Sequence, residues 1–374
     1  MRNKISDFSW KIPVITALFL LNVWSALYAD VRHNPVRSMK TIKEYGKSLD
    51  WSKTRNKIAS ARIGDDGYYD VFVMNPDGSG EIVLTHNKPS CPRMHNGNPA
   101  WHPSGKYIVF TAMNENATGQ LAKKMGIPGT GINCNLWLMK GDGSEFQRLT
   151  NIPTRVYNAG GVIHPQFSPD GKKLFWAERI GKNKNFTWGE WALKVADFSF
   201  ESGKPVLRNI KKYQPGNNKS FYESHGFTPD GEKVIFSGNL IRGQKESGLD
   251  IYEMDLRTGA VKRLTESLND WDEHAHYSPD GKKVAWMSSN GFNLKFPSLK
   301  GHSWHRYLKT DLWIMDSNGS NKKRITFYNQ PGIGRRTIVS DSAWSPDGKK
   351  IAALVAYMKK NGRYEVKIVL IELK

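Results

Sequence analysis

Cysteine is scarce in this chain of 374 residues, which contains two, Cys91 and Cys134. No C-x-x-C-H occurs, so the chain itself attaches no c-type haem, and no C-x-x-C pair is present to hold zinc. In an oxidising compartment the two thiols could form a disulfide. The sequence alone does not place them within bonding distance, so their pairing stays open.

Acidic residues are also few, with 35 Asp and Glu against 55 Lys and Arg, for a formal net charge of +20. This balance favours anionic partners such as nucleic acid, acidic glycans, lipid headgroups or acidic proteins, or else simply keeps the surface soluble. The basic residues are spread along the chain, and no signature of a nucleic-acid-binding module is present. We therefore expect no nucleic-acid partner.

Long apolar runs are missing after the N-terminus. There, a basic leader precedes an apolar run that ends in small residues, which predicts a secretory signal peptide over residues 1–29. Its apolar core, residues 12–21, is short for about 30 Å of hydrocarbon, which favours cleavage over a retained anchor. We expect an exported mature chain, residues 30–374, in the periplasm or an equivalent lumen, without membrane contact after cleavage.

What the chain does contain is a repeat. Each unit is a strand, a turn of the Pro-Asp-Gly type and a second strand, in which Pro and Gly suit the two corners of the turn. Alternating segments such as LDIYEMD and DLWIMD follow several units and lead into a short fourth strand. The six units occupy residues 49–62, 99–112, 165–178, 225–238, 275–288 and 342–355.

The repeat predicts an all-β fold. A four-stranded antiparallel sheet cannot bury both of its faces alone, but radially stacked sheets bury one another, which favours a single β-propeller over an open sandwich. The last unit ends after its third strand, so we expect the segment 34–46 to supply the fourth and close the ring with N- and C-terminal strands. Six blades are predicted, and a seventh could lie within residues 185–213.

These W/F-S-P-D-G-K-K-I-x-F units, followed by D-I/L-W/Y-x-M-D strands, resemble the TolB-type propellers over nearly the whole mature chain. The resemblance implies the fold. It says little about function, because such propellers include scaffolds, peptidase propellers and lyases.

A polar register precedes each repeat. The residues three positions before the anchoring aromatics are all polar, and alternation along a strand should turn them together toward the upper central channel. They are Ser48, Asn98, His164, Ser224, His274 and Asp341. His276 should point the same way, and His225 lies one residue out of register. The resulting candidates for a ligand or metal site at the channel mouth are His164, His225, His274, His276, Glu273 and Asp341.

Long loops are predicted on the face where the first strands begin, here called the top face. The loops 113–134 and 289–309 connect second to third strands, and the loops 86–98, 151–163 and 327–341 connect blades. Long loops on one face of a rigid scaffold commonly carry binding. The basic docking candidates that they bring are Arg93, Arg155, Arg306, Arg335 and Arg336.

Three interpretations of this face remain open. In the first, the histidines hold a divalent metal such as Mn, Zn, Ni or Cu, which would suit a polysaccharide lyase or a propeller that binds acidic oligosaccharides. This idea resembles the metal-dependent oligogalacturonate lyases, without a residue-by-residue match. Alternatively, the histidines line a water-filled channel, or the top face docks another protein.

The opening of the mature chain, from ADVRHNPVRSMKTIKEYG through NPDGSGE, and the six-unit layout resemble the β subunits of hydrazine synthases from anaerobic ammonium-oxidising bacteria. The resemblance implies a haem-free subunit of an exported complex, located in the anammoxosome. Partner subunits would carry the c-type haems that join nitric oxide and ammonium into hydrazine. We favour this subunit role over a lyase, because no complete catalytic constellation is evident.

Overall fold

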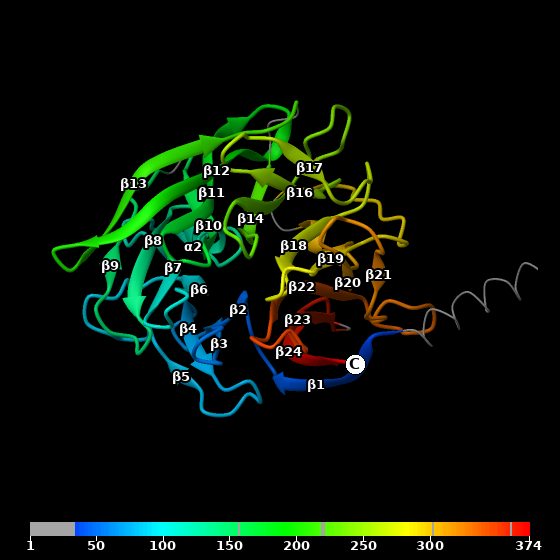
Figure 1. The fold of residues 1–374 in the computed structure, drawn as a ribbon, viewed down its shortest axis with the longest axis horizontal. Helices are drawn as coiled ribbons and strands as arrows, with labels where there is room; N and C mark the ends of the chain where they lie inside the picture. The colour runs from blue at the N-terminus through cyan, green and yellow to red at the C-terminus, as the bar shows by residue number, and fades with distance from the viewer. Residues whose placement is uncertain (1–33, 156–157, 218–220, 301–302, 360) are drawn as a thin grey trace, which may run out of the picture.

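The predicted propeller is confirmed. The computed structural model describes residues 34–374 except 156–157, 218–220, 301–302 and 360, so the predicted signal peptide, residues 1–29, lies outside it. Within the described residues, the strands form six four-stranded antiparallel sheets that stand around a central axis (Figure 1). The chain is thus a six-bladed β-propeller.

The first three blades follow chain order from the axis outward. Blade 1 contains β2 (Leu49–Trp51), β3 (Ile58–Ile63), β4 (Tyr69–Met74) and β5 (Ile82–Val83). Blade 2 contains β6 (Asn96–Trp101), β7 (Tyr107–Met113), β8 (Cys134–Lys140) and β9 (Gln147–Arg148). Blade 3 contains β10 (Gly161–Phe167), β11 (Lys173–Asn183), β12 (Phe186–Glu201) and β13 (Lys204–Tyr213).

The remaining blades continue the ring. Blade 4 contains β14 (Tyr222–Phe227), β15 (Lys233–Gly238), β16 (Asp250–Asp255) and β17 (Val261–Arg263). Blade 5 contains β18 (Asp272–Tyr277), β19 (Lys283–Ser288), β20 (Asp311–Asp316) and β21 (Lys323–Arg324). Blade 6 contains β22 (Thr337–Trp344), β23 (Lys350–Met358), β24 (Tyr364–Leu373) and β1 (Val36–Lys43).

The closing strand is β1, as the truncated last repeat predicts. It pairs antiparallel with β24, from Val36 opposite Leu373 to Lys43 opposite Ile368. In Figure 1 the blue β1 lies alongside the red β24. The edge that the C-terminal chain leaves unpaired is therefore covered by the N-terminal chain, which removes a free strand edge from the last blade.

The segment 185–213 does not form a seventh blade. It supplies β12 and β13, the outer strands of blade 3, and β12 pairs with β11 from Lys173 opposite Asp197 to Asn183 opposite Phe186. The strands β11 and β12 are longer than the second and third strands of the other blades. The additional residues of this segment therefore lengthen existing strands and add no new ones.

Helix is nearly absent from the described residues. A short helix α2 (Gln120–Met125) and a 3-10 turn η1 (Ser303–Arg306) lie in the two long loops between second and third strands. In the described part of the chain, no helix has the length and apolar character needed to cross a membrane.

The hydrogen bonds and backbone conformation of the repeated turn account for its sequence. In blade 3 the Ser168 hydroxyl donates to the Asp170 carboxylate at 2.6 Å, and the Gly171 N–H donates to the Ser168 carbonyl at 2.8 Å. Gly171 has φ of 73°, a value that costs glycine little. Ser278 and Asp280 form the same hydroxyl contact in blade 5, at 2.6 Å.

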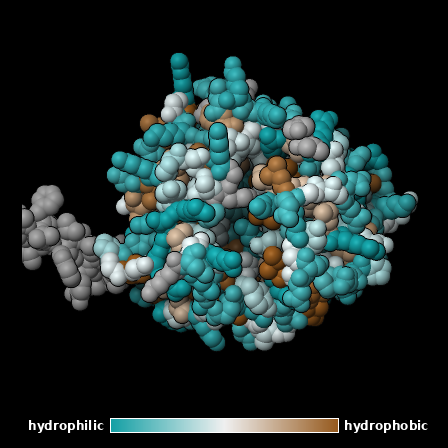
Figure 2. Space-filling view, turned by 180° about the vertical axis from the view of Figure 1, so that it is seen from behind, coloured by the Kyte–Doolittle hydropathy of each residue, from teal (hydrophilic) through white to brown (hydrophobic). Residues whose placement is uncertain are grey.

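The core lies between blades. Where the ring closes, Trp51 and Ile58 of blade 1 belong to one buried cluster with Leu354 and Ile368 of blade 6. Figure 2 shows a face that is largely hydrophilic, with apolar side chains in small separate groups. Apolar burial is thus concentrated between sheets, which holds the first strands rigidly around the axis.

Candidate functional site: a polar cluster in the central channel

Irregular first strands turn polar side chains toward the axis. His164 and His274 have φ of 49° and 53°, and Ser48 and Asn98 share this left-handed conformation at the same repeat position. Such values are uncommon for residues other than glycine. At His164 and His274 the pairing register with the second strand also shifts. The repeat therefore builds a bulge, and the bulge selects which residues face the channel.

The register residues do share a cavity. Its volume is about 10 Å³, enough for one water molecule or one ion. The lining residues are Ser48, Leu49, Asn98, Pro99, His164, Pro165, Gln166, Ser224, His276 and Asp341. Five of the six register positions thus surround one small space, and His274 contacts two of the carboxylates beside it.

The Glu223 carboxylate lies between two imidazoles from different blades. Its Oε1 is 3.2 Å from His164 Nε2 and 3.5 Å from His274 Nε2. One potential ligand atom from each of these three residues lies within 4.8 Å of the others. Their side chains are buried or nearly so, with 12%, 6% and 14% exposed for His164, Glu223 and His274.

Asp341 approaches the other nitrogen of His274. Its Oδ1 is 3.5 Å from His274 Nδ1 and 3.5 Å from His276 Nε2. Two backbone groups fix the carboxylate, because the N–H of Leu49 donates to Oδ2 and that of Ser342 donates to Oδ1, each at 2.8 Å. The Asp341 carboxylate is therefore held rigidly beside the His274 ring.

The other predicted candidates lie next to this group. His225 is buried, donates to or accepts from the Ser237 hydroxyl, and stacks obliquely 5.6 Å from His274. Glu273 is buried and close enough to Glu223 for the two carboxyls to interact. His225 is thus engaged in the blade, and Glu273 neighbours the cluster from the adjacent position on β18.

Protonation differs sharply within the cluster. Burial lowers the pKa of His164 to about 4, against the opposing charge of Glu223. Burial also disfavours charge on His274, but Glu223 and Asp341 raise the pKa of this ring to about 9. Burial and the charge of Glu223 hold the pKa of Glu273 well above its ordinary value. A protonated His274 offsets one of the two carboxylate charges beside it at neutral pH.

Three residues near the channel were not predicted from the sequence. Glu223 occupies the position in blade 4 that Glu273 occupies in blade 5, so the repeat alignment contained its signal. Lys47 precedes a register residue, and burial lowers the pKa of its ammonium despite the charges of Asp341 and Glu223. Asp50 lies three residues after Lys47, and its Oδ2 accepts the Trp101 N–H at 2.6 Å across the junction with blade 2.

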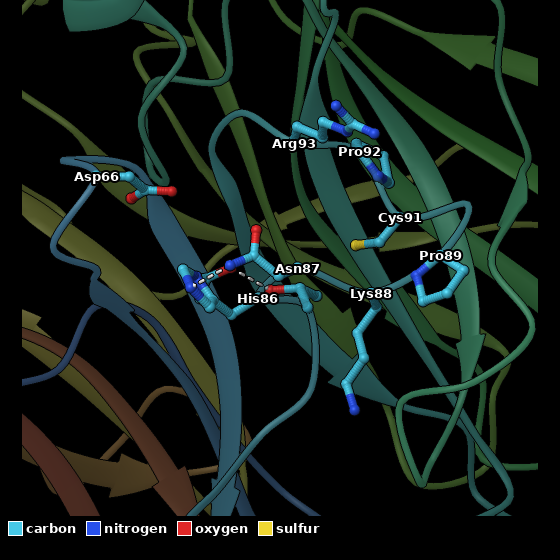
Figure 3. A pocket seen from close by; sticks show the side chains of 10 residues that line it. Asp66, His86, Asn87, Lys88, Pro89, Cys91, Pro92 and Arg93 are labelled. Atoms are coloured by element: carbon cyan, nitrogen blue, oxygen red, sulfur yellow. Dashed lines mark hydrogen bonds and ion pairs between the residues drawn. The ribbon is translucent and has the colours of Figure 1, made fainter.

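A larger pocket of about 440 Å³ opens at the rim of blade 1 (Figure 3). There the His86 Nδ1 meets Asp70 at 2.9 Å, and Thr85 donates to the same carboxylate at 2.8 Å. In blades 4 and 5, the aspartate at the position of Asp70 pairs with an arginine that lies two residues before the threonine at the position of Thr85. Blade 1 has Val83 in place of that arginine. His86 therefore replaces a missing arginine, and its contact with Asp70 is part of the blade.

The docking candidates lie in the top loops. Arg93, Arg155, Arg306 and Arg335 are exposed, whereas Arg336 is half-buried. The Arg335 guanidinium lies 5.2 Å from the centre of the Tyr357 ring and 3.5 Å from Glu365. Both cysteines are buried and free, so they do not pair.

The comparisons with known proteins agree with the fold. No known family model matches the chain. Dipeptidyl-peptidase 5 of Porphyromonas gingivalis is 24% identical over 337 residues, which cover 79% of this chain and 42% of that protein. Dipeptidyl-peptidase 5 of Porphyromonas endodontalis is 26% identical over 250 residues, which cover 58% of this chain and 32% of that protein. The chain thus spans less than half the length of these relatives.

Solved structures place the architecture among TolB-like propellers. TolB from Acinetobacter baumannii matches with a TM-score of 0.51 and 18% identity, over 86% of this chain and 66% of that one. A putative TolB from Agrobacterium tumefaciens matches with a TM-score of 0.51 and 18% identity, over 84% of this chain and 91% of that one. A gluconolactonase from Xanthomonas campestris matches with a TM-score of 0.52 and 11% identity, over 90% of this chain and 89% of that one. The protein has a TolB-like β-propeller fold, and these likenesses establish no activity.

Proposed function

We propose that the chain is a haem-free propeller subunit of an exported multi-subunit enzyme of the hydrazine synthase type, and that its top face docks the partner subunits. One observation carries this proposal: the top face presents exposed arginines on anchored loops, while the axial cavity has room for only one water or ion. A rigid basic rim suits contact with another protein. The c-type haems belong, in this proposal, to the partners.

Described residues in two of the top loops are held in place before any partner binds. Asn133 fixes the loop of blade 2 to the inter-blade loop, since its side chain accepts the Arg155 N–H at 3.0 Å and donates to the Arg155 carbonyl at 3.2 Å. The loop of blade 5 is fixed by blade 6, since Tyr364 of β24 donates to the His305 carbonyl at 2.6 Å, and Leu308 of this loop is buried. Loops that are already ordered lose less entropy on binding, which supports a docking role.

Aromatic side chains strengthen the same face. Trp304 packs 4.9 Å from Trp271, and Trp188 packs 5.3 Å from Trp271, ring centre to ring centre. Trp188 and Trp304 remain partly exposed. Tryptophan and arginine are the residue types that contribute most to protein interfaces.

The alternative, a lyase or an acidic-oligosaccharide-binding propeller, receives less support. A sugar ring does not fit a cavity of about 10 Å³, so the histidine cluster has no room for such a substrate beside it. Export is supported by the basic leader and apolar run of residues 1–29. Periplasm or an equivalent lumen is the compartment that we propose.

Co-purification from the native source tests the proposal. The untagged chain should elute with haem-bearing subunits, at a mass well above the 42.4 kDa of the full 374-residue chain. Arg155→Glu combined with Arg335→Glu should slow reassembly with the isolated partners and weaken it at least tenfold, since charge complementarity controls association. The melting temperature should change little, because both side chains are exposed.

A matched control reverses two charges on the opposite face. Lys172→Glu with Lys282→Glu alters turns at the bottom of blades 3 and 5 and should leave assembly unchanged. A native chain that purifies alone, or equal weakening by both double variants, would contradict top-face docking. Turnover of an acidic oligosaccharide by the isolated chain would favour the alternative.

A further inference from the structure

We propose that His164, Glu223 and His274 form a binding site for a single divalent transition-metal ion of the zinc type on the propeller axis. The site joins blades 3, 4 and 5, since the three residues belong to β10, β14 and β18. This metal site is independent of the proposed docking function, because docking on the top face does not require a metal on the axis.

Distances within the cluster fit a metal better than direct contacts. Zinc bonds of about 2.0–2.1 Å place neighbouring ligands of a tetrahedral site roughly 3.3–3.4 Å apart. Glu223 Oε1 lies 3.2 Å from His164 Nε2 and 3.5 Å from His274 Nε2. Two imidazoles and one carboxylate are a known zinc donor set that leaves a fourth position for water.

Asn98 defines which nitrogen lone pair His164 presents. The Gly129 N–H donates to Asn98 Oδ1 at 3.0 Å, so the amide N–H₂ of Asn98 faces His164 Nε2 at 3.3 Å. An Nε2 that carried a proton would meet this donor head-on. Nε2 of His164 is therefore unprotonated, so this nitrogen and Glu223 Oε1 are two acceptors 3.2 Å apart, and a cation between them stabilises both.

Asp341 completes the environment of the second histidine. It lies beside Nδ1 of His274, while Nε2 of the same ring faces Glu223. Metal-bound histidines commonly have a carboxylate at the nitrogen that does not bind the metal, and this partner fixes the orientation of the ring. Asp341 is itself fixed by two backbone N–H groups. A metal bound at Nε2 would complete a sequence of carboxylate, histidine and metal.

Space and access agree with one ion. The neighbouring cavity of about 10 Å³ accommodates one water beside the metal. Because the ligands come from three blades, the metal would tie together first strands that otherwise meet through packing and, between blades 3 and 4, through the 2.8 Å hydrogen bond from the Ser224 hydroxyl to the His164 carbonyl. The metal would therefore stabilise the ring, and this stabilisation can be measured without any assay of activity.

The experiment uses the untagged mature chain, stripped with a chelator and titrated with Zn²⁺. We expect about one equivalent of zinc retained after desalting, measured by elemental analysis, and a zinc-dependent rise in melting temperature. Co²⁺ in its place should give the visible absorption of a four-coordinate site. Retention of no metal by the unaltered chain would overturn the proposal.

Variants separate this site from other imidazoles. His274→Gln and Glu223→Gln should each weaken zinc binding at least tenfold and remove the thermal shift. Asp341→Asn, which alters a positioning residue, should weaken it between about 10- and 100-fold. His86→Gln, in the pocket of blade 1, is the control and should bind zinc like the unaltered chain. Zinc binding that survives both ligand substitutions, or that disappears with His86→Gln, would contradict the assignment.

Discussion

The Leu49 backbone N–H donates a 2.8 Å hydrogen bond to Asp341 Oδ2 across the junction between the first and last blades. The two residues are 292 positions apart and meet only because the ring closes. Related contacts cross other junctions: Trp101 N–H donates to Asp50 at 2.6 Å, and the Trp344 indole donates to the His276 carbonyl at 3.0 Å. Hydrogen bonds across the blade junctions near the axis thus accompany the apolar packing between blades. The bond from the Leu49 N–H to Asp341 is called the latch below.

Removing the latch should destabilise the ring. Asp341→Ala leaves the buried Leu49 N–H without its acceptor and removes the charge beside His274, which should cost about 3 kcal/mol of unfolding free energy. Chemical denaturation in the presence of a chelator measures this loss without the contribution of any bound metal. Asp347→Ala, in an exposed bottom turn, is the control and should cost less than about 1 kcal/mol. Equal losses would show that the latch has no special role.

The closing strand should be essential to the last blade. A chain that begins at residue 45 lacks β1 and exposes the edge of β24, whereas a chain that begins at residue 34 retains the pairing. The shorter chain should melt several degrees lower and self-associate through the free edge. Calorimetry and sedimentation compare the two. Identical melting and mass would mean that β1 contributes little to closure.

Stability should respond to the buried Asp50 carboxyl. Burial raises its pKa from 3.8 to about 6, so stability that is fully present below about pH 4 is lost as pH rises through 6. The loss is up to about 3 kcal/mol. Asp50→Asn does not titrate, so its melting temperature relative to the unaltered chain should rise between pH 4 and 7. Asp77→Asn serves as the control, since turn contacts lower the pKa of Asp77 and its titration lies below about pH 4, so its relative stability should stay nearly level between pH 4 and 7.

The blade 2 loop should depend on a close backbone approach. A Cβ at Gly131 would lie 2.1 Å from the Val162 carbonyl oxygen, and φ there is 62°. Gly131→Ala should therefore cost about 3 kcal/mol or more. Gly203 has a similar φ of 78° but open space around it, so Gly203→Ala should cost only about 1 kcal/mol. Equal costs in thermal unfolding would show that the loop adjusts freely.

Both thiols should be inert in the folded chain. Burial raises the pKa of Cys91 to about 12 and raises that of Cys134 further, so thiolate is scarce at neutral pH. Thiol reagents should label neither residue within minutes at pH 7.5, and both after denaturation. Rapid labelling of Cys91 in the native chain would show that the pocket of blade 1 opens in solution.

Sequence periodicity determined the architecture of this protein. Six units of strand, Pro-Asp-Gly turn and strand specify blades, because turn chemistry and alternation act over a few residues. The truncated last unit likewise predicts closure by β1. Periodicity also places Ser48, Asn98, His164 and His274 in one register, since a repeat that stacks around an axis brings equivalent residues together.

Only the tertiary structure decided which of these side chains meet, and through which atoms. Glu223 lies between His164 and His274 because bulges in three different first strands rotate them into one space, and no local pattern encodes a distance between blades. The same holds for Asp341, whose orientation depends on a backbone N–H 292 residues away. Exclusion of a seventh blade also needed the tertiary structure, because residues 185–213 are numerous enough for extra strands but form β12 and β13 of blade 3. Local chemistry sets strands and turns, whereas closure of the ring sets the contacts at its axis.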